Sequence, residues 1–201
     1  MGARRSRVRI IACGALAREL TEVLRDAALG DVRVECLPAA LHDRPERIPD
    51  LVRARVRSAK AAGEHVLVGY ADCGTGGRLD AVCAEEGVER LPGAHCYELF
   101  AGPEVFAALH EREPGTFYVT DYLVRNFDRL VVAGLGLDRH PELQAVYFGN
   151  YRRLVHLAQH EDDDLDRRAR AAAKRLGLVH ERRATGVDGL RRSLHAVGAP
   201  R

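Results

Sequence analysis

Three cysteines stand just past short apolar runs that have the length and composition of buried strands. They are Cys13, Cys73 and Cys96, and the runs before them cover residues 8–12, 66–68 and 88–91. The carboxyl ends of parallel strands lie at one edge of a sheet, where ligand crevices form. We therefore expect the three thiols to gather at that edge, although they are far apart in sequence.

His42 lies in the loop that follows a further apolar run, residues 32–37, and can join these thiols. Two or three thiolates with an imidazole match the ligand preferences of zinc and other thiophilic metals. We predict a metal site, with zinc as the expected ion and Cys13, His42, Cys73 and Cys96 as its ligands. The sequence has no CxxC pair, so the prediction depends on strand topology. A free cysteine nucleophile is the alternative.

The other cysteines and histidines are interpreted as structural. Cys36, inside a strand, and Cys83, on an apolar helical face, are expected to be buried packing residues. Surface positions are expected for His65, His110, His160 and His195. Glu19, on the first predicted helix beyond Cys13, is a candidate hydrogen-bond acceptor or proton carrier; its other interpretation is an exposed carboxylate.

The segment GTGG after Cys73 precedes a helical pattern that begins at Arg78. Its members Gly74, Thr75, Gly76 and Gly77 are candidates for a phosphate cradle that holds a nucleotide or S-adenosylmethionine. The segment lacks the lysine and the serine or threonine of a Walker loop. A simple glycine-rich turn is the competing interpretation.

A further set of polar residues follows the run 116–119. Asp121 and Tyr122 come directly after this predicted strand, so they are expected on the same edge as Cys73. Our hypothesis is that Asp121, Tyr122 and Asn150 form a crevice wall that orients the substrate. Asn150 precedes a strand and is the weakest member; core packing of the neighbouring aromatic residues is the alternative.

These residues require a particular set of elements. Runs with strand character alternate with helical patterns, for a total of six or seven strands, and this alternation predicts an α/β protein. We expect one domain over residues 1–201, with a mostly parallel sheet and helices on both faces. One long helix is expected from Tyr122 to Val132, and another from Asp50.

Composition narrows the functional class. Against 31 basic residues stand 29 acidic ones, and this balance argues against a dedicated nucleic-acid or anionic-membrane surface. No apolar run approaches the roughly 20 residues of a membrane span, and no signal-peptide pattern follows the basic start. We expect a cytoplasmic protein. Its five cysteines, an odd number without framework spacing, favour thiols over disulfides.

Several segments together resemble the family of domain of unknown function 1638, over about residues 8–160. They are IACGALARELTEVL, LHDRPERI, VLVGYADCGTGG, GAHCYELFAG and EPGTFYVTDYLVRNFDRL. The family pattern carries cysteine at the positions of Cys13, Cys73 and Cys96, histidine at His42 and an acidic residue at Glu19. Where members commonly read arginine, alanine, histidine, aspartate, cysteine, this chain reads GAHCY, which puts any substrate contact of that arginine and aspartate in doubt.

Members of that family are often encoded beside corrinoid-dependent methylamine methyltransferases. The resemblance implies one-carbon or corrinoid metabolism, with a small-molecule substrate or a corrinoid protein as partner. We therefore expect a metal-thiolate protein that assists methyl transfer. The alternatives are a nucleotide or S-adenosylmethionine binding module and a non-catalytic accessory protein of a corrinoid methyltransferase system. Whether the chain is an enzyme stays open.

Overall fold

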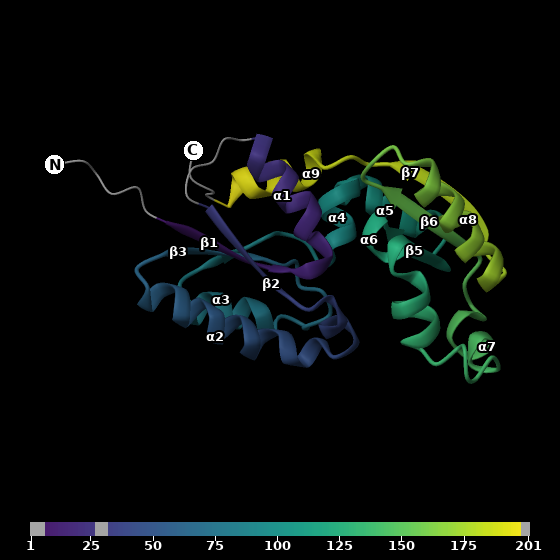
Figure 1. The fold of residues 1–201 in the computed structure, drawn as a ribbon, viewed down its shortest axis with the longest axis horizontal. Coiled ribbons are helices and arrows are strands. Elements are labelled where there is room, and N and C mark those ends of the chain that lie inside the picture. The colour runs from purple at the N-terminus through teal and green to yellow at the C-terminus, as the bar shows by residue number, and fades with distance from the viewer. Residues whose placement is uncertain (1–6, 27–31, 198–201) are drawn as a thin grey trace. The chain divides into compact units, whose positions relative to one another are not determined.

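The computed structural model describes residues 7–26 and 32–197 (Figure 1). Strands and helices alternate along the chain, and each strand pair is parallel. The predicted α/β class is thereby confirmed. The seven strands of the described residues form two sheets, of four and three strands, instead of the one sheet that we expected.

The chain divides into two compact units, each of which is described by itself. The first contains the described residues up to Leu99 and those from Val187 onward, and the second extends from Phe100 to Gly186. The expectation of a single domain over residues 1–201 concerns how the units fold together and stays a prediction.

In the first unit, the sheet has the order β2-β1-β3-β4. Its strands are β1 (Val8–Cys13), β2 (Val32–Leu37), β3 (His65–Gly69) and β4 (Glu89–Arg90). Its helices are α1 (Ala17–Asp26), α2 (Ile48–Ala61), α3 (Arg78–Glu86) and α9 (Asp188–Ala196), with short 3₁₀ turns η1 (Gly14–Leu16), η2 (Ala39–Asp43) and η3 (Pro45–Arg47). Helices α1 and α9 cover one face of this sheet, and α2 and α3 cover the other (Figure 1).

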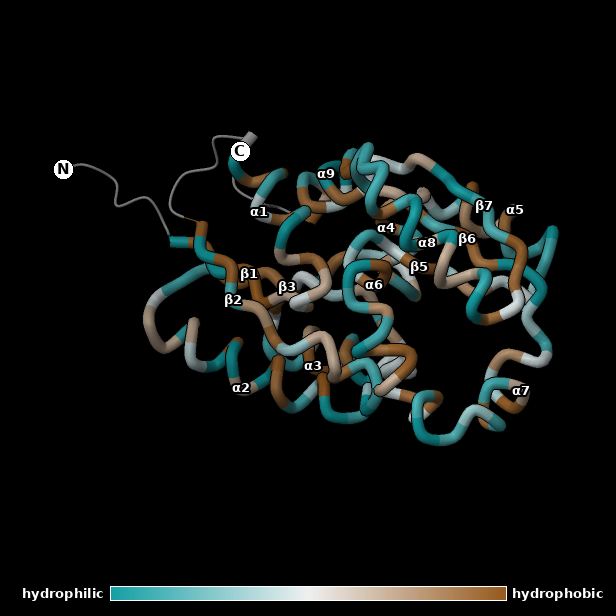
Figure 2. Tube along the Cα trace, turned by 45° about the vertical axis from the view of Figure 1, so that its right-hand side comes forward, coloured by the Kyte–Doolittle hydropathy of each residue, from teal (hydrophilic) through white to brown (hydrophobic). Residues whose placement is uncertain are grey.

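Whether a strand lies in the middle or at the edge of this sheet explains how far its side chains are buried. The central strand β1 reads VRIIAC and is mostly hydrophobic in Figure 2, because it is covered on both faces. Strand β2 lies at the edge and exposes Cys36. The prediction that Cys36 is buried was therefore wrong, whereas Cys83 on α3 is buried as expected. Helix α2 begins at Ile48, before the predicted Asp50, because its first turn tolerates Pro49.

In the second unit, the sheet has the order β5-β6-β7. Its strands are β5 (Thr116–Thr120), β6 (Arg153–Ala158) and β7 (Val179–Ala184). Its helices are α5 (Pro103–Arg112), α6 (Asp121–Arg125), the π-helix η4 (Asp128–Ala133), α7 (Leu143–Phe148) and α8 (Asp163–Leu176). Helix α4 (Cys96–Ala101) begins in the first unit, which extends to Leu99, and ends in the second.

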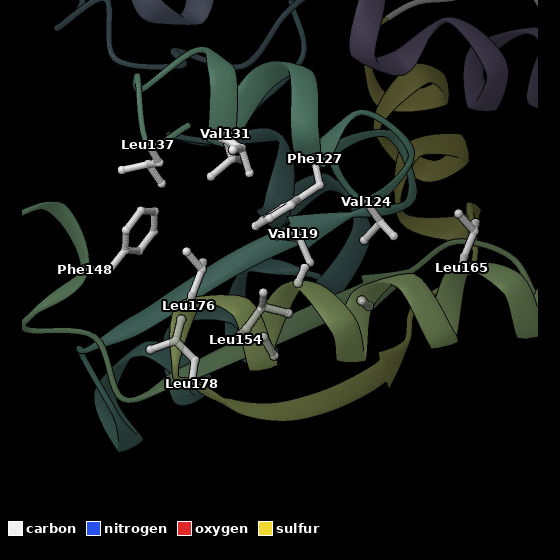
Figure 3. Packing of buried hydrophobic residues seen from close by; sticks show 14 residues of the cluster. Val119, Val124, Phe127, Val131, Leu137, Phe148, Leu154, Leu165, Leu176 and Leu178 are labelled. Carbon is white, nitrogen blue, oxygen red and sulfur yellow. The ribbon is translucent and has the colours of Figure 1, made fainter. Parts of the chain in front are cut away.

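The core of the second unit lies between the sheet and the helices α6, η4 and α8 (Figure 3). Val119 and Leu154 point from the sheet toward Phe127, Val131 and side chains of α8. The sequence predicted one helix from Tyr122 to Val132, but α6 ends at Arg125. There the Asn126 side chain donates a hydrogen bond to the Tyr122 carbonyl over 2.8 Å, and the chain continues as a π-helix. Among the described residues, no helix is long and apolar enough to cross a membrane.

Candidate functional site

Cys13 and His42 meet at the carboxyl edge of the first sheet. Cys13 is the last residue of β1, in register with Leu37 at the end of β2. The chain turns there through η2, which carries His42, and its Nδ1 lies 3.9 Å from the Cys13 Sγ. The Ala15 amide donates to the same sulfur over 3.3 Å. The thiol of Cys13 thus has both an amide donor and an imidazole beside it.

The His42 ring is held by two further contacts. Its Nδ1 lies 2.9 Å from the Ala39 carbonyl oxygen, to which a protonated Nδ1 donates. The ring also stacks on Tyr70, at a centroid distance of 6.5 Å and an interplanar angle of 21°. Because Nδ1 donates to Ala39, Nε2 is the nitrogen that becomes free to bind a metal ion or to accept a proton when the ring is neutral. These contacts orient His42 as a ligand or base.

Cys73 follows β3 in a strained turn. Its φ of +50° makes it the one non-glycine residue with positive φ among those described. Left-handed backbone is costly for a residue with a Cβ, and it persists where surrounding contacts impose it. Here the Asp72 and Cys73 amides donate to the Gly93 and Ala94 carbonyls over 3.1 and 2.9 Å. The loop after β4 is thereby fastened to the loop after β3.

This fastening places Cys96 beside Cys73. Cys73 interacts with Cys96 and with His42, and both interactions lower the pKa of its thiol. All five cysteines are free thiols. The four residues expected as metal ligands are therefore linked by a series of interactions from Cys13 through His42 and Cys73 to Cys96.

Two further residues belong to this cluster, although the sequence did not nominate them. The His95 Nδ1 lies 3.6 Å from the Cys96 Sγ, and its ring packs on Tyr97 at 4.0 Å. Tyr70 is fully buried directly after β3. Both lie just past a strand end and close in sequence to a nominated cysteine, and this position is the sequence feature that could have identified them.

The pKa values of the groups in the cluster depend on one another. The hydrogen bond from Cys96 and the nearby His42 lower the pKa of Cys73 to about 4. Burial lowers the pKa of His42, but the interactions of its ring with Cys13 and Cys73 outweigh burial and raise the pKa to about 11. The hydrogen bond to Cys73 and burial raise the pKa of Cys96 well above its ordinary value. At neutral pH the cluster thus contains a Cys73 thiolate, a His42 imidazolium and a protonated Cys96.

Burial keeps two neighbouring groups uncharged. It raises the pKa of Tyr70, with the charges of Cys13 and Cys73 as further causes, so the phenol stays protonated. Burial also lowers the pKa of His95. A protonated phenol and a neutral imidazole therefore flank the thiolate, and both can exchange hydrogen bonds with it or with a bound ligand.

As they stand, the side chains do not form a closed metal site: over residues 7–26 and 32–197, no three or more His, Cys, Asp or Glu are grouped so as to hold an ion. Glu19, expected either as an acceptor near Cys13 or as an exposed carboxylate, is buried, with 1% of its surface exposed. The exposed interpretation was therefore wrong, and its proposed role stays a prediction.

The GTGG segment already binds an anion of the chain itself, the carboxylate of Asp72. Asp72 accepts hydrogen bonds from the Gly76 and Gly77 amides over 3.1 and 2.9 Å, and from the Thr75 hydroxyl over 2.5 Å. Desolvation opposes ionisation, but these bonds lower the pKa of Asp72. The cradle candidates are Gly74, Thr75, Gly76 and Gly77, and the amides of the last two therefore already bind a carboxylate. The negative charge of this carboxylate also repels phosphate.

Asp121, Tyr122 and Asn150 belong to the second unit, so the hypothesis that they form a wall opposite the cysteines stays a prediction. Asp121 is fully buried, Tyr122 is half-buried and Asn150 is exposed. The Asp121 carboxylate binds His156 Nε2 at 3.0 Å and His160 Nδ1 at 2.8 Å. The surface position expected for His160 was wrong, because this carboxylate draws the ring inward.

The sequence from residue 36 to 194 matches the family described as protein of unknown function (DUF1638). The chain belongs to this family. The matched range includes the DUF1638 chain's His42, Cys73 and Cys96, whereas Cys13 and Glu19 lie before it. Our expected boundaries of about 8–160 thus began too early and ended too early. No curated protein and no solved structure matches the DUF1638 chain.

Proposed function

We propose that this DUF1638 protein holds a thiophilic metal ion, with zinc expected, at the carboxyl edge of its first sheet. Cys13, His42, Cys73 and Cys96 would be its ligands. The observation that carries the proposal is the convergence of these four side chains from four separate loops of one unit. Cys36 and Cys83 stay outside the cluster.

The donor set fits such a site. Zinc takes thiolate sulfur and neutral imidazole nitrogen as ligands, with bonds of about 2.3 and about 2.1 Å. His42 would bind through Nε2, because its Nδ1 lies 2.9 Å from the Ala39 carbonyl oxygen. The ligands would have to close on the ion, since the described residues contain no preformed metal group.

The surrounding residues would prepare the ligands. The Ala39 carbonyl fixes the His42 tautomer, in the manner of outer hydrogen-bond partners at metal sites. Cys73 is ionised at neutral pH, so its coordination would release no proton. Tyr70 stays protonated and can donate to a bound anion.

The chemistry that we propose is the activation of a thiol as methyl acceptor. A bound metal ion would supply the charge that holds a substrate thiol as thiolate at neutral pH. Transfer of a methyl group from a corrinoid-class donor to that sulfur is the reaction class, and this part rests on the family resemblance. Glu19, Asp121 and Tyr122 stay candidates for moving a proton and orienting the substrate.

A second candidate function is covalent catalysis by Cys73 without metal. Two observations favour it: the backbone strain at φ +50°, and a pKa of about 4, with His42 as the neighbouring cation. Strained turns after strands and thiolate–imidazolium pairs both occur where a nucleophile is held ready. The two candidates differ in whether the protein needs a metal ion.

Metal content distinguishes them. Untagged protein is expected to contain about one metal ion per chain by elemental analysis, and Cys13→Ser, Cys73→Ser, Cys96→Ser and His42→Ala are expected to lose it. The control Cys83→Ser removes a buried thiol of the same unit and should keep the metal. If none of the four variants loses metal, or the protein holds none after growth with added zinc, the metal proposal fails and covalent catalysis by Cys73 takes its place.

Two alternatives to the metal proposal remain. One is binding of S-adenosylmethionine or a nucleotide at residues 74–77, and the other is association with a corrinoid protein. A ligand that binds the native state raises the midpoint of thermal unfolding. Saturable stabilisation by S-adenosylmethionine would support the first. Because Asp72 occupies the Gly76 and Gly77 amides, we expect none. Co-purification with a corrinoid protein would test the second.

A further inference from the structure

A pocket of about 550 Å³ lies within the second unit, between the segment that joins α6 to η4 and the exposed side of α8. Its volume is in the range of small-molecule sites. The lining residues are Val124, Arg125, Asn126, Phe127, Asp128, Arg129, Arg168, Ala171, Ala172 and Arg175. None of them belongs to the cysteine cluster.

The pocket concentrates positive charge. Arg125 and Arg129 lie on the wall formed by the junction of α6 and η4, and Arg168 and Arg175, seven residues apart on α8, share one face of that helix. Asp128 is the one acidic residue of the lining. The whole chain has a net charge of only +2, so this concentration is local.

The four guanidinium groups are unequally paired within the described residues. Arg168 forms a salt bridge to Asp164 at 2.6 Å, and Arg125 lies 3.6 Å from Asp121. Arg129 donates a hydrogen bond to the Asn126 amide oxygen over 2.9 Å but has no carboxylate partner there, and Arg175 forms no salt bridge there. One buried nitrogen of Arg125 has no hydrogen bond. Guanidinium groups that line one pocket repel each other, and an anion bound between them relieves the repulsion.

The remaining lining suits a ligand with an apolar part. Val124, Phe127 and Ala172 are buried, and Ala171 and Ala172 leave room over α8. The wall opposite α8 is the start of a π-helix, a form that occurs often at functional sites. Apolar contacts with a few convergent charged groups are what a small-molecule site provides.

We propose that this pocket binds a small organic molecule with oxyanion groups, phosphate or carboxylate, and that Arg129 and Arg175 hold those groups. A guanidinium presents its donors in a planar fork that matches two oxygens of either group. This site goes beyond the proposed metal function, because it uses other residues in the other unit.

The test compares two double variants with the same loss of charge. R129Q/R175Q removes the two pocket arginines, while R139Q/R170Q removes two exposed arginines of the same unit that do not line the pocket. Titration calorimetry would use inorganic phosphate, pyrophosphate, glycerol 3-phosphate and succinate, with sodium chloride to match ionic strength. Circular dichroism checks that both variants are folded.

We expect saturable binding of at least one probe to the native chain and to R139Q/R170Q, with affinity about tenfold or more weaker in R129Q/R175Q. Preference for the phosphate probes or for succinate identifies which oxyanion the site takes. The proposal is overturned if no probe binds saturably. It is equally overturned if both double variants weaken binding alike, because the effect would then be one of net charge.

Discussion

The backbone amide of Cys73 donates a hydrogen bond to the carbonyl oxygen of Ala94 over 2.9 Å. This bond joins the loop after β3 to the loop after β4, and it sets the Cys73 thiol beside Cys96, two residues beyond Ala94. The ionisation of Cys73 depends first on that neighbour. A backbone contact between two loops thus determines the electrostatics of the candidate site.

The first prediction concerns the Cys73 thiolate in metal-free protein. Because Cys96 and His42 lower its pKa to about 4, the ultraviolet absorbance of a thiolate should appear as the pH rises through about 4. Cys73→Ser should abolish this step, and His42→Gln should move it to higher pH.

Cys83 provides the control for this titration. Burial raises its pKa to about 11, so it stays protonated at neutral pH, and Cys83→Ser should leave the acid step unchanged. An acid step that survives in Cys73→Ser would mean that another thiol carries the negative charge.

The second prediction is that Asp121 stabilises the fold in a pH-dependent way. Burial opposes its ionisation, but His156 and His160 hold its pKa below the ordinary value. A depressed carboxyl pKa in the folded state contributes stability above the unfolded pKa of about 3.9, and the contribution is lost as the pH falls through the folded pKa.

Asp121→Asn should therefore lower the free energy of unfolding near neutral pH by roughly 2–4 kcal/mol, because it removes the charge between buried partners. The difference from the native chain should shrink below about pH 4. Urea unfolding at several pH values measures it, with exposed Asp138→Asn as control. A pH-independent difference would show that the carboxylate charge is not the cause.

The third prediction concerns Arg153, a buried cation in β6. Its guanidinium donates to the Thr116 hydroxyl, the Glu181 carboxylate and the Leu109 carbonyl over 2.8, 2.8 and 2.6 Å. A lysine cannot reproduce this planar set of donors. Arg153→Lys should destabilise the protein by roughly 2–3 kcal/mol in urea unfolding.

The neighbouring Arg152 is exposed and provides a matched control. Arg152→Lys should change the unfolding free energy by less than about 0.5 kcal/mol. Equal effects of the two substitutions would contradict the assignment of Arg153 to a buried network.

The fourth prediction tests the close packing of β1 against β3. A Cβ at Gly69 would lie 2.8 Å from the Ala12 Cβ and 3.1 Å from the Ile10 Cγ2, closer than van der Waals contact. Gly69→Ala should destabilise the chain by roughly 1–3 kcal/mol, as overpacking does.

Ala12→Gly in the same chain removes one of the clashing atoms, so the double variant should lose less than the sum of the two single variants. A double-mutant cycle of urea midpoints measures this coupling. Additive losses would mean that Ala12 and Gly69 do not pack against each other as described.

The sequence by itself indicated the strands of the first sheet and that Cys13, His42, Cys73 and Cys96 follow strands at one edge of it. Short apolar runs mark buried strands, and the direction of parallel strands alone brings their carboxyl ends to one edge. The α/β class follows from the same alternation of elements. These features depend on residues close together in sequence and on chain direction, so no tertiary contact had to be known.

Other features were decided only by tertiary structure. Strand order made β2 an edge strand and exposed Cys36, and the division into two sheets depends on which strands pair. The burial of Glu19 and Tyr70, the contact of His160 with Asp121, and the contact of His95 with Cys96 depend on how the chain packs. Side-chain burial and pKa depend on neighbours distant in sequence, and hydrophobic periodicity contains no information about which neighbours those are.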